Sequence, residues 1–135
     1  MTYVDQRSTK KAVFIYSAIT ILCILIPFIY HFFAHGVSSP YMTFLALFPF
    51  ILGVIPCMLL LIFWKLKRPG NITINIYNSG VAAITVSSLL RGIFEIAGTG
   101  SALQSGLMIF GIVTTAAGII LYFLTDKKRK NISAI

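Results

Sequence analysis

Charge is scarce along most of this chain. Of its 135 residues only 10% are charged and three are acidic, and no charged residue occurs between Lys11 and Lys65. Two further stretches, 69–90 and 96–125, also carry none. A soluble domain of this length could not cover its apolar side chains, because 58% of the residues are hydrophobic. Apolar runs of about 18 residues or more are typical of membrane-spanning helices, so the sequence predicts an integral membrane protein.

Motifs for catalysis, redox chemistry and cofactor binding are also missing. The chain has two cysteines, Cys23 and Cys57, and no Cys-x-x-Cys motif, which argues against a thiol oxidoreductase. It has no hydrolase triad or paired carboxylates. Its Gly98–Ser101 segment lacks the later glycine and the lysine of phosphate-binding loops. We therefore expect no enzymatic activity and no bound cofactor.

Basic residues gather in three clusters at the ends of the apolar runs. These are Arg7, Lys10 and Lys11; Lys65, Lys67 and Arg68; and Lys127, Lys128, Arg129 and Lys130. The net charge of +8 therefore does not indicate nucleic-acid binding, because membrane proteins carry such clusters on the cytoplasmic side of their helices. The clusters would also attract anionic lipid headgroups. Placing all three in the cytoplasm gives an even number of spans and two short, uncharged outer loops.

Four membrane helices are predicted, over residues 12–34, 41–64, 72–97 and 103–125. We expect one domain, residues 1–135, that forms an antiparallel all-α bundle in the bilayer with both termini in the cytoplasm. Residues that bend a helix or allow close contact fall on one face of the second predicted helix and one face of the fourth. They are Pro49, Gly53 and Pro56 on the second, and a seam of Gly111, Thr115 and Gly118 on the fourth.

Arg91 and Glu95 are the two charged residues inside an apolar run. They stand four apart, so both project from one face of the third predicted helix. A charge at the bilayer centre costs about 2.5 to 3.5 kcal/mol on insertion scales, so the presence of these two residues requires a structural or functional explanation. That helix would be about 39 Å long, against about 30 Å for the hydrocarbon core, which puts the pair near its outer end. A structural ion pair that ties this helix to its neighbours is the favoured interpretation, because interior charges need pairing. A helix C-terminus disfavours an anion, so Glu95 also leaves open a further partner, such as the two histidines or a cationic ligand.

Other candidate binding residues also belong to the outer half of the predicted bundle: His31, His35, Tyr41 and Ser88. The two histidines stand four apart on one predicted helical face, a spacing that can hold a metal ion. The chain offers no second histidine pair, and Glu95 is the one acidic candidate nearby. We therefore expect packing or hydrogen bonding at these histidines, and no metal site.

Two functions fit these features. The first is a small, non-enzymatic subunit that binds, assists or regulates within the membrane; the seam and the bent second helix would contact a second copy or another membrane protein. The alternative is a small-solute transporter or channel that uses Arg91 and Glu95 in an outward-facing polar site. A conduit needs a continuous polar lining, yet segment 81–86 near the midplane offers only Thr85, which favours the subunit. A third function, phage-type pore formation, is supported only by the small size of the chain and its basic C-terminal tail. Small size and the absence of targeting signals indicate a multi-pass protein of the bacterial plasma membrane.

Overall fold

The part of the chain that the structure describes is mostly helical. The computed structural model describes residues 6–33, 35, 39–63 and 69–135, and these contain no strand. Three helices are long and apolar enough to cross a membrane: residues Thr9–Phe33 of α1 (Gln6–Phe33), α5 (Asn71–Ile96) and α6 (Ala102–Ser133). The chain is thus all-helical and carries three candidate membrane spans.

The prediction of one continuous helix over residues 41–64 is wrong. This part of the chain forms α2 (Pro40–Thr43), α3 (Leu47–Pro49), a π-helical turn η1 (Phe50–Val54) and α4 (Ile55–Ile62), and residue 64 lies outside the described residues. Pro49 and Pro56 cause the break, because a proline has no N–H for the carbonyl four residues earlier. Between α2 and α3 the backbone closes a tighter turn, in which the Leu47 N–H donates to the Phe44 carbonyl 3.0 Å away. The stretch Leu47–Ile62 is shorter than the three candidate spans.

The other helices match the prediction at most of their ends. α5 and the start of α6 lie within one residue of it. α5 ends at a glycine turn: Gly98 has a φ of +68°, and the Thr99 N–H donates to the Phe94 carbonyl at 2.9 Å. α6 continues past residue 125 to Ser133, because its charged end still forms helix, with Asp126 and Lys130 paired at 3.4 Å one turn apart. α1 likewise begins earlier than predicted, at Gln6.

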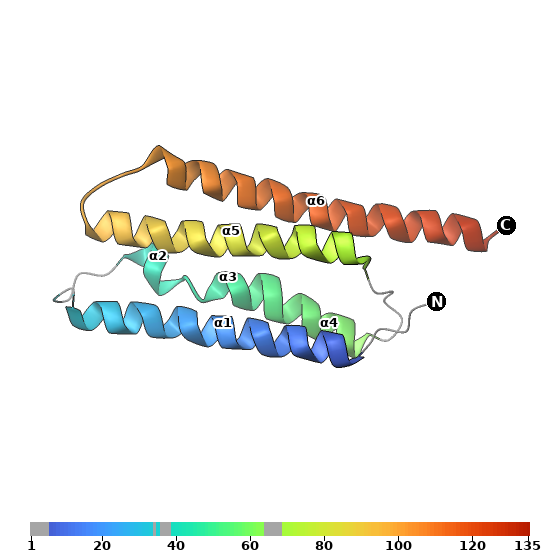
Figure 1. Ribbon diagram of the computed structural model, residues 1–135, viewed down its shortest axis with the longest axis horizontal. Helices are drawn as coiled ribbons and strands as arrows, with labels where there is room; N and C mark the ends of the chain where they lie inside the picture. The colour runs from blue at the N-terminus through green and yellow to red at the C-terminus, as the bar shows by residue number, and fades with distance from the viewer. Residues whose placement is uncertain (1–5, 34, 36–38, 64–68) are drawn as a thin grey trace.

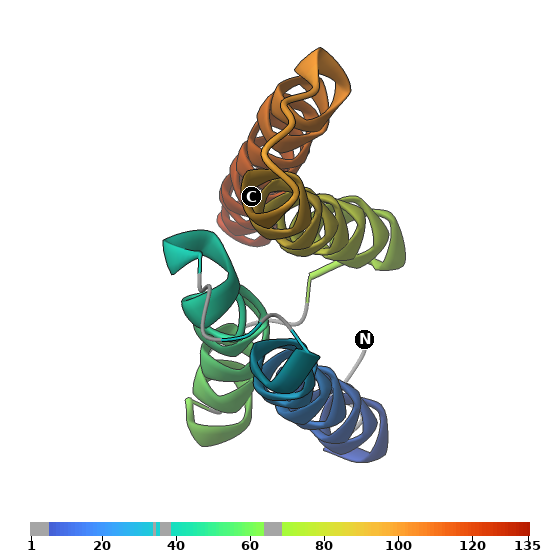
Figure 2. The same cartoon turned by 90° about the vertical axis from the view of Figure 1, so that its left-hand side faces the viewer.

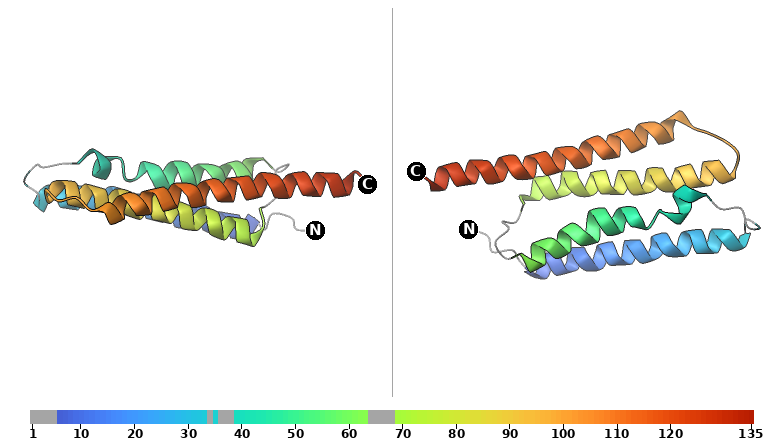
Figure 3. Two further views of the ribbon diagram at one scale, coloured as in Figure 1. Left: turned by 90° about the horizontal axis from the view of Figure 1, so that it is seen from above. Right: turned by 180° about the vertical axis from the view of Figure 1, so that it is seen from behind.

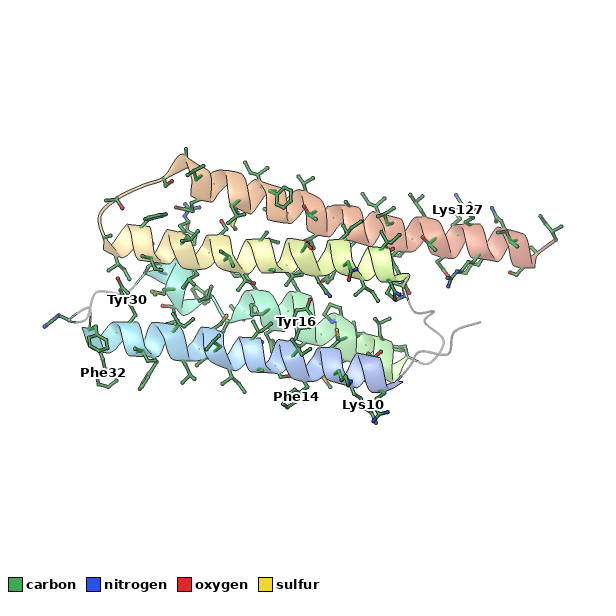
Figure 4. All side chains as sticks on the ribbon, in the orientation of Figure 1. Lys10, Phe14, Tyr16, Tyr30, Phe32 and Lys127 are labelled. Carbon is green, nitrogen blue, oxygen red and sulfur yellow. The ribbon has the colours of Figure 1, made fainter. Side chains whose placement is uncertain are left out.

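α1, the α2–α4 segment, α5 and α6 run in alternating directions along the molecule (Figure 1). The start of α1 and the end of α6 lie at one end of the molecule, and α2 lies at the other (Figures 1 and 3). Lys10 and Lys127 both lie at the first of these ends (Figure 4), which we call the basic end. The opposite end is called the α2 end. The third basic cluster, Lys65, Lys67 and Arg68, lies outside the described residues.

Apolar side chains cover the outside of the helices. Phe14 and Phe32 are 75% and 72% exposed and point away from the neighbouring helices (Figure 4). The buried apolar core is small by comparison and consists of Cys23, Met42, Leu45, Val54, Val81 and Ile84. Such an apolar exterior is suited to lipid rather than to water.

The helices form two pairs, α5 with α6 and α1 with the α2–α4 segment (Figure 2). Of the helices in the described part of the chain, α6 packs against α5 alone. Gly111, Thr115 and Gly118 are buried in that interface, where a Cβ on Gly111 would lie 2.8 Å from the backbone N of Ile84. The predicted close-packing seam is therefore confirmed. Because α5 occupies it, the seam is not available to a partner, which corrects that part of the subunit hypothesis.

Polar side chains near the middle of the bundle join the two pairs. The Tyr16 ring of α1 covers Gly53, where a Cβ would lie 2.1 Å from the ring, and its hydroxyl donates to Oδ1 of Asn78 at 2.5 Å. The Tyr77 hydroxyl of α5 donates to the Leu52 carbonyl at 2.6 Å. This is the carbonyl that the second proline of the segment leaves without its α-helical donor. The glycine and proline face of η1 and α4 is thus contacted by α1 and α5 of the same chain. This corrects the expectation that the bent segment uses this face to contact a partner.

Candidate functional site at the α2 end

α2 and the residue before it lie across α5 at the α2 end of the molecule and contact the two charged residues there. The Ser39 hydroxyl donates a hydrogen bond to Oε2 of Glu95. The Arg91 guanidinium lies over the Tyr41 ring, with its Cζ 4.1 Å from the ring centroid, at a distance that allows a cation–π interaction. Each charged side chain therefore has a partner on a segment distant in sequence.

One face of α5 carries this contact. Ser88, Arg91, Gly92 and Glu95 recur at the three- and four-residue spacing of a single helical face. The absence of a side chain at Gly92 lets α2 approach, because a Cβ there would lie 3.1 Å from Cβ of Met42. The Ser88 hydroxyl is fully buried and donates to the Tyr41 carbonyl at 3.4 Å. α2 is therefore held at several points along about two turns of α5.

Arg91 and Glu95 do not form an ion pair with each other. Within the described part of the chain, the one ion pair found is Asp126–Lys130. Glu95 instead has a partner outside its own helix, the hydroxyl of Ser39. Both charged residues remain exposed at the molecular surface. The site therefore holds the two charges apart and directs each to α2.

The two histidines do not share a helical face, which corrects the prediction. α1 ends at Phe33, and His35 follows it with a φ of 50° and its Nδ1 3.0 Å from the Phe33 carbonyl oxygen. His31 lies on α1 and is exposed. Across the residues that the structure describes, no three His, Cys, Asp or Glu side chains come together in a way that could hold a metal ion.

A cleft of about 310 Å³ opens beside this site, between α1 and the α2–α3 segment. Its apolar walls include Cys23, Pro27 and Phe28 of α1 and face Met42 and Ala46 across the cleft. The polar side chains that line the cleft are Tyr30, His31, Ser39 and Thr43. Helix α5 contributes Ile96 to the lining. Tyr30 lies near the α2 end of α1 (Figure 4). Ser39 thus belongs both to the cleft wall and to the contact with Glu95.

The polar side chains along α5 lie in several different surroundings. Asn71 and Asn75 are exposed, and Asn78 is bonded to Tyr16. Thr85 is buried, and its hydroxyl donates back to the Val81 carbonyl of its own helix at 2.9 Å. The apolar side chains of Val81 and Ile84 are buried next to it. The described residues near the centre of α5 therefore form packed core and not a polar lining.

Sequence reasoning missed Ser39, Met42 and Gly92 as parts of the site. Ser39 occupies the N-cap position before Pro40, but its hydroxyl makes no capping bond and binds Glu95 instead. The one signal in the sequence that could have pointed to Ser39 is its position as a polar residue directly before a proline, after an uncharged loop.

Comparisons with models of protein families, with curated protein sequences and with solved structures find no match for this chain.

Proposed function

We propose that this protein is a four-pass protein of the bacterial plasma membrane that acts as a non-enzymatic binding, accessory or regulatory subunit. In this proposal the broken segment 40–62 crosses the membrane in addition to the three long helices, as the second pass in chain order. The basic end faces the cytoplasm. The longest helical stretch of the broken segment, Leu47–Ile62, would extend about 24 Å, and α2 adds the remaining depth. Lys10 and Lys127 at the basic end support this orientation, because lysine and arginine favour the cytoplasmic side.

The observation that carries the subunit role is the docking of α2 on the charged face of α5. Ser39 and Tyr41 engage Glu95 and Arg91, so the two charges serve to fix α2 at the outer end. A transporter would need these groups connected to a polar path, but the side chains around Thr85 are packed and internally bonded. The geometry favours a rigid platform at the outer surface over a conduit.

Topology is tested first, by cysteine accessibility. In a chain with Cys23 and Cys57 replaced by alanine, single cysteines are placed at Thr99, in the turn after α5, and at Ser133, at the end of α6. A membrane-impermeant maleimide added to intact cells should label Thr99→Cys and should label Ser133→Cys only after permeabilisation. Labelling of both from outside, or of Ser133→Cys alone, would refute the proposed orientation.

Function is tested by two measurements on the full chain. Native gels of mildly solubilised membranes should show the chain in an assembly larger than the purified protein, and its migration as the free chain would refute the subunit role. Vesicles that contain the purified protein should show the proton and cation leak of protein-free vesicles. A leak above that level, abolished by Glu95→Gln, would replace the subunit proposal with the transporter.

A further inference from the structure

The cleft beside Ser39 has the shape of a slot that runs along α1. It is lined on this helix from Cys23 to His31, a length of about 12 Å at 1.5 Å per residue. Its volume of about 310 Å³ falls at the small end of the range for ligand sites, about 300 to 1,000 Å³. Such a slot accommodates an extended chain better than a compact ring system.

The two ends of the slot differ in polarity. Toward the middle of the bundle its walls are apolar, with Cys23, Ile24 and Pro27 on α1 and Ala46 opposite. Toward the α2 end, Tyr30 and Ser39 line it. An occupant that satisfies both ends has an apolar tail directed into the bundle and a polar head at the α2 end.

The negative charge of Glu95, next to the polar end of the slot, indicates which polar group the occupant carries. Ser39 donates to one carboxylate oxygen of Glu95, and an ionised carboxylate can accept further hydrogen bonds through its second oxygen and its remaining lone pairs. Glu95 is exposed, and the neighbouring cation Arg91 is directed to the Tyr41 ring. An ammonium group that carries N–H donors would therefore find a free anionic acceptor beside the mouth of the slot.

We propose that this cleft binds a phospholipid with an ethanolamine headgroup, with one acyl chain between α1 and the α2–α3 segment and the ammonium group at Glu95. A choline headgroup has no N–H to donate and would lose the hydrogen bond to the carboxylate. The assignment goes beyond the subunit role and requires only that α1 and α5 lie in a bilayer. Its test therefore fails or succeeds independently of the flux and assembly measurements above.

Native mass spectrometry of the purified full chain provides the test. Phosphatidylethanolamine, phosphatidylcholine and phosphatidylglycerol with identical acyl chains are titrated separately into detergent micelles, and the bound lipids are counted. We expect phosphatidylethanolamine to bind about tenfold more tightly than phosphatidylcholine, the difference expected for one charge-assisted hydrogen bond. Glu95→Gln should reduce its affinity to the level of phosphatidylcholine.

Two variants test whether the chain lies in the slot. Ala46→Leu fills the slot from one wall and should weaken binding of both zwitterionic lipids about tenfold or more. Ile24→Trp narrows it from a side chain that is 56% exposed, so it remains informative if Ala46→Leu unfolds. Ala82→Leu, at an exposed position of α5 away from the cleft, is the matched control and should bind lipid as the wild type does.

Three outcomes would overturn the proposal. Unchanged lipid binding in Ile24→Trp and in folded Ala46→Leu would exclude the slot. Equal affinity for ethanolamine and choline lipids, together with no effect of Glu95→Gln, would exclude the ammonium site. A preference for phosphatidylglycerol over phosphatidylethanolamine would assign the bound lipid to the basic end instead.

Discussion

Gly80→Ala is the most direct test of how closely α5 and α6 pack. A Cβ built on Gly80 would lie 2.2 Å from Oγ1 and 2.5 Å from the backbone N of Thr115. The Thr115 hydroxyl can rotate, but the backbone N can move only with its helix. The two helices must therefore separate locally before an alanine fits.

The cost follows from the size of that separation. To bring the new Cβ from 2.5 Å to an ordinary contact of 3.4 Å with the backbone N, α6 must move by about 0.9 Å. A gap of this size removes about a quarter to a half of the dispersion energy of each affected atom pair. Overpacking typically costs about 1 to 3 kcal/mol, and we expect about 3 kcal/mol here because the obstacle is backbone. Gly118→Ala should cost about 1 kcal/mol, since its Cβ would lie 3.0 Å from Cα of Tyr77.

The assay is reversible unfolding of the purified chain in mixed micelles with an increasing fraction of dodecyl sulfate, followed by circular dichroism. Gly106→Ala is the matched control, because it lies on α6 and nothing stands within 4 Å of a Cβ built there. It should stabilise the protein by up to about 1 kcal/mol through the better helix propensity of alanine. Subtracting its effect isolates the clash at Gly80 from the change in propensity.

A small difference would refute the packing. If Gly80→Ala and Gly106→Ala change the free energy of unfolding by amounts within about 0.5 kcal/mol of each other, the close approach of α5 and α6 is wrong. The order Gly80, Gly118, Gly106, from most to least destabilising, is the expected result, because it follows the order of the three distances.

Three further changes test contacts between the helix pairs, each by the same unfolding assay. Tyr16→Phe removes the hydroxyl that bonds Asn78 and should cost about 0.5 to 1.5 kcal/mol; a double-mutant cycle with Asn78→Leu that shows strict additivity would contradict the bond. Tyr77→Phe should cost about 1 kcal/mol by leaving a π-helical carbonyl without its donor, and an unshifted infrared band of that carbonyl, isotope-labelled, would contradict this. Tyr41→Leu should cost about 0.5 to 1 kcal/mol by removing the ring from Arg91, whereas Tyr41→Phe should be nearly neutral; equal effects of the two would exclude the cation–π contact.

Sequence reasoning predicted the long helices well because each is a run of apolar residues with clear ends. The glycine turn after α5 is an example, since Gly98 adopts the positive φ that favours glycine. The prediction from sequence failed at the second apolar run, residues 41–64. A proline inside a membrane helix often only bends it, and whether Pro49 and Pro56 bend or break the helix depends on donors from other helices. One such donor is the Tyr77 hydroxyl, whose position no local pattern reveals.

The candidate site shows the same division between local and long-range information. Arg91 and Glu95 stand out because a charge in an apolar run is costly, and Tyr41 and Ser88 do contact each other in the structure. The partner of Glu95 could not be predicted, because Ser39 is 56 residues away in sequence. Ser39 stands at the N-cap position of α2, and the docking of α2 on α5 directs its hydroxyl to Glu95.

The pairing of the helices has a consequence for how the protein is made. α1 with the α2–α4 segment, and α5 with α6, are two consecutive hairpins, so in the proposed four-pass topology each can enter the membrane as it leaves the ribosome. Within the second hairpin, closely packed glycines bring the backbones together. Between the hairpins the described contacts include the polar bonds Tyr16–Asn78, Tyr77–Leu52 and Ser39–Glu95. Lipid offers no hydrogen-bonding partners in the bilayer core, so matching donors to acceptors would guide the last step of assembly, in which the two inserted hairpins find each other.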